Sequence, residues 1–207
     1  RIPANRENFI KQLARSIHTS YFVMLIVVFV FSFGIANFQS TLSMYLTEKF
    51  DYTPMDIAIV MTIGGFLGVI LQLFIVDQLF KRFGEMKVIL VNLIIAAISM
   101  IGMVYVSGFF LILLVASVFQ IATTFIRPAV NTLISKLAGN EQGYAAGMNN
   151  AYMSLGNMIG PALAGVLLEW KLSSPFIFGA MILFGCYLIA HLWTVKKAPQ
   201  LLKTTNE

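Results

Sequence analysis

The sequence has little charge and almost no cysteine. Charged residues make up 11% of its 207 residues, whereas a soluble domain carries roughly 25%. The single cysteine, Cys186, excludes an internal disulfide framework and is most simply a buried apolar side chain. The sequence also has no Ser-His-acid set, no metal-ligand cluster and no phosphate-binding glycine loop. We therefore predict that the chain is not an enzyme and that it binds neither a metal nor a cofactor.

Apolar residues are abundant in place of charge. They form 58% of the chain, and the mean hydropathy is +0.84. A helix of about 20 apolar residues spans a bilayer, and six segments of this sequence are apolar enough and long enough to do so. Their predicted bounds are 21–46, 55–77, 86–106, 109–134, 145–168 and 175–195. The sequence thus predicts an all-α membrane protein, with a transmembrane bundle over residues 19–195 surrounded by the lipid bilayer.

The segments that flank the predicted bundle are polar and basic. Residues 1–18 alternate Arg or Lys with Ile and Leu, which is typical of an amphipathic helix along the headgroups or of a linker. Residues 196–207 are expected to form a tail. An even number of spans puts both flanks on one side with most Lys and Arg residues, leaving Lys49 and Lys171 on the other. The positive-inside rule then predicts cytoplasmic termini in a cell membrane, and the basic charge indicates headgroup anchoring rather than nucleic-acid binding.

Small residues recur at every fourth position in two predicted spans. They are Gly64 and Gly68 in the second span, and Gly156, Gly160 and Ala164 in the fifth, where Pro161 and Gly165 accompany them. Such stripes let helix backbones approach closely in lipid, and neighbouring helices satisfy the carbonyl that proline leaves free. The two spans are the middle helices of two three-span halves, so their similarity predicts a 3+3 inverted repeat. A chance match of two glycine-rich helices is the alternative.

The first and fourth predicted spans each carry one polar helical face. Positions 32, 36, 39 and 43 (Ser, Ala, Gln, Ser) are spaced by four, three and four residues, and positions 120, 124, 127 and 131 (Gln, Thr, Arg, Asn) repeat that spacing. Lipid-facing surfaces lack such faces, so we expect these to point at protein or water. For the Ser and Thr positions we favour hydrogen bonding between helices inside a closed bundle. Arg127 is the stronger functional candidate because a permanent charge in a span is costly, although it also lies near enough to a membrane face to snorkel.

Three stretches of the sequence carry recognisable motifs. They are residues 32–40 with Tyr45, residues 147–161 with Asn149-Asn150 and Gly160-Pro161, and the charged residues 77–87. Together they resemble the major facilitator superfamily, and within it the NorA-like drug:proton antiporters of bacteria. The resemblance implies the C-terminal six-helix half of a twelve-helix fold, with the N-terminal six-helix half as its partner. The start at Arg1 rather than Met likewise leads us to expect a fragment or a processed product.

The stretch 77–87 is expected to be the cytoplasmic loop that carries a superfamily motif. Arg82, Gly84 and Lys87 fit that motif. Lys81 stands where the acidic residue belongs, and Asp77 stands where the first glycine belongs. The resemblance therefore implies only a modest gating role, in which a charged loop latches one conformation by pairing with its neighbours.

Carboxylates are missing from the middle of every predicted span. All nine acidic residues fall in connections or at span ends. Asp56 is the best placed, but a helix N-terminus attracts an acid for capping and dipole reasons alone. Gln39 stands where the NorA-like exporters carry a glutamate, and glutamine cannot exchange a proton. Because proton coupling usually needs a membrane-embedded carboxylate, we expect the coupling groups for protons to lie in the other half.

The sequence has more candidate residues for binding a substrate than for binding a proton. The 18 Phe and 11 Met residues offer deformable apolar surfaces that suit ligands of many shapes. Superfamily architecture implies that the first and fourth spans line a central cavity, while the second and fifth meet the other half through their small-residue stripes. The candidates for the cavity are Asn37, Phe38, Gln39, Gln120, Thr124, Arg127, Asn150, Tyr152 and Met153. Arg127 has three candidate roles: holding anionic groups, biasing the pKa of a partner, or anchoring the cytoplasmic gate.

The resemblance implies a transporter that exports amphipathic drugs or toxic metabolites by alternating access, coupled to protons. A facilitator for a defined sugar or organic acid is the alternative within the same class. A six-helix binding subunit or a channel is the alternative from another class, although no span shows the ring of charged or carbonyl groups that a selectivity filter needs.

Overall fold

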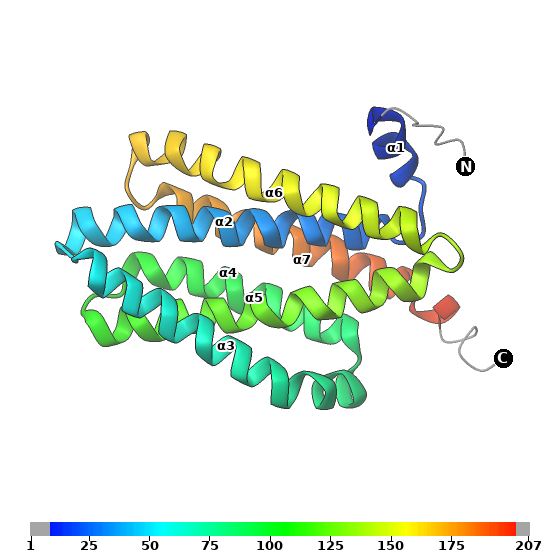
Figure 1. Cartoon of the computed structure of the whole chain (residues 1–207), viewed down its shortest axis with the longest axis horizontal. Helices are drawn as coiled ribbons and strands as arrows, with labels where there is room; N and C mark the ends of the chain where they lie inside the picture. Colours follow the sequence, from blue (N-terminus) through cyan, green and yellow to red (C-terminus); the bar gives the residue numbers. More distant parts are fainter. Residues whose placement is uncertain (1–8, 202–207) are drawn as a thin grey trace, which may run out of the picture.

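The computed structural model describes residues 9–201, and within this range it contains helices and no strands. The helices are α1 (Phe9–Ser16), α2 (Phe22–Phe50), α3 (Pro54–Phe83), α4 (Glu85–Tyr105), α5 (Phe109–Ala138), α6 (Gln142–Trp170) and α7 (Ser174–Leu201). Six of them, α2 to α7, are long enough and apolar enough to cross a membrane. They run up and down in one elongated bundle (Figure 1). We call the end where α2 begins the α1 end and the opposite end the far end.

The six predicted helices are confirmed, and their starts agree with the prediction to within a few residues. Four of them continue several residues past their predicted ends. The largest difference falls on the stretch 77–87, which we expected to be a loop. Asp77, Lys81 and Arg82 belong to α3 and Lys87 to α4, so that Gly84 alone joins the two helices. Its φ of 78° lies in the left-handed region, which glycine adopts without strain.

The structure describes only part of the two predicted flanking segments, 1–18 and 196–207. The interfacial segment predicted over 1–18 contains the short helix α1, and its residues 1–8 lie outside the described range. The predicted tail 196–207 begins as a continuation of α7, and its residues 202–207 also lie outside that range. Helix α1 is held to the start of α6, because Arg15 forms an ion pair of 2.5 Å with Glu141 and the Tyr144 hydroxyl donates to the Gln12 carbonyl.

The start of α3 shows why an acid stands at the far end of the bundle. Thr53 caps the helix by accepting from the Asp56 backbone N–H, while the Asp56 carboxylate accepts from the Thr53 backbone N–H. Pro54 occupies the first turn, where a missing N–H has no cost. This reciprocal pair is a capping box. The interpretation of Asp56 as a capping residue is therefore confirmed.

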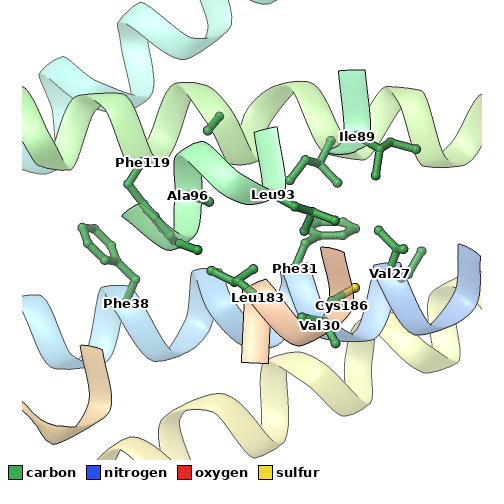
Figure 2. Packing of buried hydrophobic residues seen from close by; sticks show 14 of the residues in the cluster. Val27, Val30, Phe31, Phe38, Ile89, Leu93, Ala96, Phe119, Leu183 and Cys186 are labelled. Carbon is green, nitrogen blue, oxygen red and sulfur yellow. The ribbon is translucent and has the colours of Figure 1, made fainter. Parts of the chain in front are cut away.

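The hydrophobic core lies between α2, α4, α5 and α7. Figure 2 shows side chains from these four helices meeting there, among them Phe31 of α2, Leu93 of α4, Phe119 of α5 and Leu183 of α7. Cys186 is buried in this cluster as a free thiol, as its apolar surroundings led us to expect. By contrast, α3 and α6 bury few residues and leave broad apolar faces exposed. They flank the bundle rather than form its centre.

The small-residue stripes pack inside this six-helix unit. A Cβ at Gly156 would lie 2.5 Å from the Phe29 carbonyl oxygen of α2, and one at Gly160 would lie 2.8 Å from the Phe33 carbonyl oxygen. The other stripe, on α3, packs against α5, where the nearest atoms belong to side chains. Our expectation that these stripes meet the other half is therefore wrong. Small residues only indicate that some backbone comes close, and here that backbone belongs to the same chain.

Two further members of the fifth-span set behave differently from each other. Ala164 is buried, as expected for the third position of the stripe. Gly165 has nothing within 4 Å of where its Cβ would be and is exposed. Helix geometry explains this outcome, because one residue further along rotates the position by about 100° away from the contact face. Gly165 therefore makes no close contact within these six helices, and its packing role stays a prediction.

Candidate functional site

A hollow of about 690 Å³ lies between α2, α3, α5 and α6. Its lining residues fall near the middle of each helix, so the hollow sits at mid-depth in the bundle. We call it the central hollow. Its lining comprises Phe31, Ser32, Ile35, Ala36, Phe38, Gln39, Ser40, Val69, Gln72, Phe119, Gln120, Thr123, Thr124, Arg127, Met153, Asn157 and Pro161. Its size lies within the range of about 300–1,000 Å³ that is typical of small-molecule sites.

One wall of the central hollow is aromatic. The rings of Phe38 and Phe119 stack with centroids 4.0 Å apart, joining α2 to α5 (Figure 2). Phe31 and Ile35 continue this wall along α2, and Met153 faces it from α6. Aromatic and thioether side chains offer contact area without demanding hydrogen bonds of fixed direction. This wall can therefore accept apolar groups of varied shape.

The lining of the hollow also carries side-chain amides. Gln120 donates from Nε2 to the Met61 carbonyl oxygen of α3 at 3.3 Å. Gln39, Gln72 and Asn157 also line the hollow, and they come from α2, α3 and α6. Amides both donate and accept, so they can satisfy polar groups of a ligand without fixing its charge.

Arg127 is the charged residue of the hollow. Its Nη2 lies 3.7 Å from the Met153 sulfur, and no carboxylate of the described residues lies within 4.0 Å of its guanidinium. The side chain is exposed to the hollow. None of the lining residues is acidic. The central hollow is therefore electrostatically positive in the part of the chain that the structure describes.

Two prolines leave backbone carbonyls free beside the hollow. Pro128 lies inside α5 and Pro161 inside α6, and each lacks the N–H that would bond to the carbonyl four residues earlier. Those carbonyls belong to Thr124 and Asn157, which both line the hollow. Each helix thus lacks one backbone hydrogen bond at the level of the hollow.

The structure brings together six of the nine residues that we predicted for the cavity: Phe38, Gln39, Gln120, Thr124, Arg127 and Met153. The other three lie elsewhere. Asn37 is fully buried and points toward α7, where a Cβ at Gly179 would lie 3.4 Å from its Oδ1. Tyr152 lies on another face of α6 and shares a hydrogen bond of 2.9 Å with Ser16. Asn150 is exposed outside the hollow.

Sequence reasoning missed Gln72, Asn157 and Pro128, although signals for each were present. Gln72 continues the every-fourth-residue series of Gly64 and Gly68, so it shares their helical face. Asn157 precedes Pro161 by four residues, which marks its carbonyl as free. The same rule applied to Pro128 marks Thr124.

Comparison with known proteins identifies the family. Residues 24–207 match the sequence model of the Major Facilitator Superfamily. The chain belongs to the major facilitator superfamily. Its six-helix bundle is accordingly half of the superfamily's fold, and the chain is a multi-pass membrane protein.

Curated relatives within the superfamily are bacterial resistance proteins. Multidrug resistance protein 2 of Bacillus subtilis is 39% identical over 190 residues, covering 92% of this chain and 48% of the relative. Multidrug resistance protein 1 of the same organism is 36% identical, covering 90% of this chain and 47% of the relative. Quinolone resistance protein NorA of Staphylococcus aureus is 35% identical, covering 79% and 42%. The chain thus spans about half the length of the curated relatives it matches.

Proposed function

We propose that this chain is the C-terminal six-helix half of a transporter that exports amphipathic drugs or toxic metabolites by alternating access. Its partner is the N-terminal six-helix half, and the two enclose a cavity to which the central hollow contributes. By the positive-inside rule, the Lys and Arg residues predicted for the α1 side support our proposal that both ends of the chain lie in the cytoplasm of a bacterial cell. The names of the relatives, which refer to multidrug and quinolone resistance, support this proposal.

The central hollow is the observation that carries the proposal. It lies at mid-depth, where alternating-access transporters bind their substrates. It combines the stacked rings of Phe38 and Phe119 with amides from several helices. A site for one defined sugar would instead require polar groups in fixed directions, because each unmatched hydroxyl is costly to desolvate. The mixture present here favours ligands that are largely apolar and vary in shape.

Proton coupling is the less direct part of the proposal. The carboxylates of the described residues stand away from the central hollow, and Gln39 offers no titratable group there. A proton that drives export therefore binds in the N-terminal half, and Arg127 acts as the positive charge that faces it across the cavity. An adjacent cation lowers the pKa of a carboxyl group. Arg127 in this role favours release of the proton once the substrate has left.

The test is dye efflux from proteoliposomes that hold the full-length protein. We expect ethidium export that follows an imposed pH gradient, and a strong loss of that export in Arg127→Ala. Arg127→Lys keeps the charge and should retain part of the activity if charge is what matters. Lys196→Ala is the matched control, because Lys196 is exposed on α7 and does not line the hollow.

The possible outcomes separate the alternatives. Export that ignores the pH gradient contradicts proton coupling and favours a facilitator. Absence of dye movement in the wild type contradicts multidrug export and points to a dedicated metabolite carrier or a binding subunit. Equal losses in Arg127→Ala and Lys196→Ala contradict the assigned role of Arg127.

A further inference from the structure

A second hollow opens on the side of the bundle, between α3 and α4 near the α1 end. Its volume is about 520 Å³, and neither α2 nor α6 contributes to it. Its lining includes Leu79, Phe83, Val91, Ile95, Phe125 and Tyr187. We call it the lateral groove. Gly84 alone joins α3 to α4 at the α1 end of the groove, between the lining residues Phe83 and Lys87.

The interior of the lateral groove is apolar. Asn92 is the amide in its lining, and its Nδ2 donates to the Val88 carbonyl of the same helix at 2.8 Å. That donor is therefore already satisfied and does not call for a polar ligand. Phe125 is almost completely buried and lies at the base of the groove. An apolar surface that is open at this position favours an apolar occupant.

The rim of the groove at the α1 end is positively charged. Lys87 belongs to the lining itself. The Arg82 guanidinium lies 5.4 Å from the ring centroid of Phe83, which also lines the groove. Glu85 is the acid beside them in the sequence, and it is already paired with Lys136 at 2.5 Å. Its charge is therefore balanced, which leaves those of Lys87 and Arg82 available.

The helices that line the groove expose apolar side chains, which suits a surface in contact with hydrocarbon. Exposed side chains next to it on α4 and α7 are apolar, including Ile98, Phe184 and Leu188. The central hollow, by contrast, is lined also by α2 and α6, and under the proposed function it is the site where a second half has polar groups to contact. The groove thus combines an apolar slot at acyl-chain depth with cations at headgroup depth.

We propose that the lateral groove is a binding site for an anionic phospholipid. One acyl chain lies in the slot along α4, and the phosphate lies between Lys87 and Arg82. Charge complementarity selects an anionic headgroup over a zwitterionic one, because the two cations at this rim lack an acidic partner within the described residues. This site is independent of the central hollow, and its occupancy does not depend on which substrate is exported.

Native mass spectrometry tests this site on the full-length protein released from micelles with equal amounts of phosphatidylglycerol and phosphatidylcholine. We expect the protein to retain phosphatidylglycerol in preference. Lys87→Gln should reduce that preference about fivefold, the effect of one cation near an anionic surface. Lys11→Gln, at an exposed lysine on α1 at the same end, should leave it unchanged.

A second pair of variants tests the slot. Val91→Trp fills the groove from an exposed position and should remove the retained lipid, whereas Ile98→Trp, on the same helix but outside the lining, should not. Both positions are exposed, so the fold tolerates the larger ring, and an unchanged elution volume checks this. Equal losses in Lys87→Gln and Lys11→Gln overturn the proposal, as does lipid retention that survives Val91→Trp. Displacement of the lipid by glycerol phosphate alone also overturns it, because a headgroup without chains would then be sufficient.

Discussion

The contact between α2 and α6 and the contact between α3 and α5 are equivalent in the inverted repeat, yet they are built differently. In each pair, glycines from a middle helix press against the first helix of the other three-helix repeat. The glycines of α6 meet backbone atoms of α2, among them the Phe29 carbonyl and the Phe33 N–H. The glycines of α3 come closest to the side chains of Gln120 and Thr124 on α5, which both line the central hollow; the nearest backbone atom, Ser117 Cα, would lie 3.1 Å from a Cβ at Gly64.

Because of this difference, we expect the α2–α6 contact to be more rigid than the α3–α5 contact. Backbone atoms cannot move without bending the helix, so the α2–α6 contact fixes the spacing of its helices. Side chains change rotamer at low cost, so the α3–α5 contact can adjust when a ligand engages Gln120 or Thr124. If the central hollow binds ligands as proposed above, we expect α2 and α6 to move as one unit and the α3–α5 side of the hollow to adapt to the ligand.

The largest expected effect comes from Gly156→Ala. The added methyl would lie 2.5 Å from the Phe29 carbonyl oxygen and 2.8 Å from the Phe33 nitrogen, so α2 and α6 must separate. Overpacking of this kind costs about 1–3 kcal/mol, and a rigid backbone on the other side puts this case at the upper end. The thermal midpoint of the detergent-solubilised protein, followed by size-exclusion chromatography after heating, should fall by many degrees.

Gly165→Ala is the control for that measurement. It makes the same chemical change on the same helix, where nothing lies within 4 Å. Alanine is the better helix former by about 1 kcal/mol, so this variant should be neutral or slightly more stable. Equal losses in the two variants would show that α6 is sensitive to its glycines everywhere and that the α2 contact is not special.

An intermediate effect is expected for Gly68→Ala, and it should be reversible by a second change. The added methyl would lie 2.9 Å from the Thr124 hydroxyl oxygen but 3.5 Å from the Thr124 Cβ. Removing the hydroxyl through Thr124→Ala therefore makes room. We expect a loss of about 1 kcal/mol in the single variant and recovery in the double variant, since residues in contact give non-additive energies.

We expect a second substitution to restore stability at the α3–α5 contact but not at the α2–α6 contact. No side-chain replacement on α2 can relieve Gly156→Ala, because the two nearest atoms there belong to the backbone. A stability cycle on Gly68 and Thr124 that is simply additive would mean that the α3–α5 contact is not adjustable, and the mechanical distinction would then fail.

Helix number, polar faces and close-packing stripes could all be predicted from the sequence, because each depends on a local period. The helix that packs against each stripe could not be predicted, because Gly156 and Gly160 indicate only that some backbone comes close. The sequence also did not indicate which face of α2 lines the cavity. That helix is buried on most sides, and both Ala36 and Asn37 have apolar neighbours in the sequence. Asn37 was therefore placed in the cavity, while the structure turns it toward α7.

The smallest effect is expected for Gln120→Leu, and it tests how weakly α3 and α5 are tied. The bond from Gln120 to the Met61 carbonyl measures 3.3 Å, and hydrogen bonds between membrane helices contribute about 0.6 kcal/mol on average. Leucine has a similar volume to glutamine, so the thermal midpoint should fall only slightly below that of the control variant Gln39→Leu. Gln39 also lines the hollow, from α2, and makes no hydrogen bond within the described residues. A fall comparable to that of Gly156→Ala would mean that this bond locks α3 to α5 as firmly as the backbone contact locks α6 to α2. A small fall leaves Gln120 free to exchange its helix partner for a ligand, which is what an adaptable wall requires.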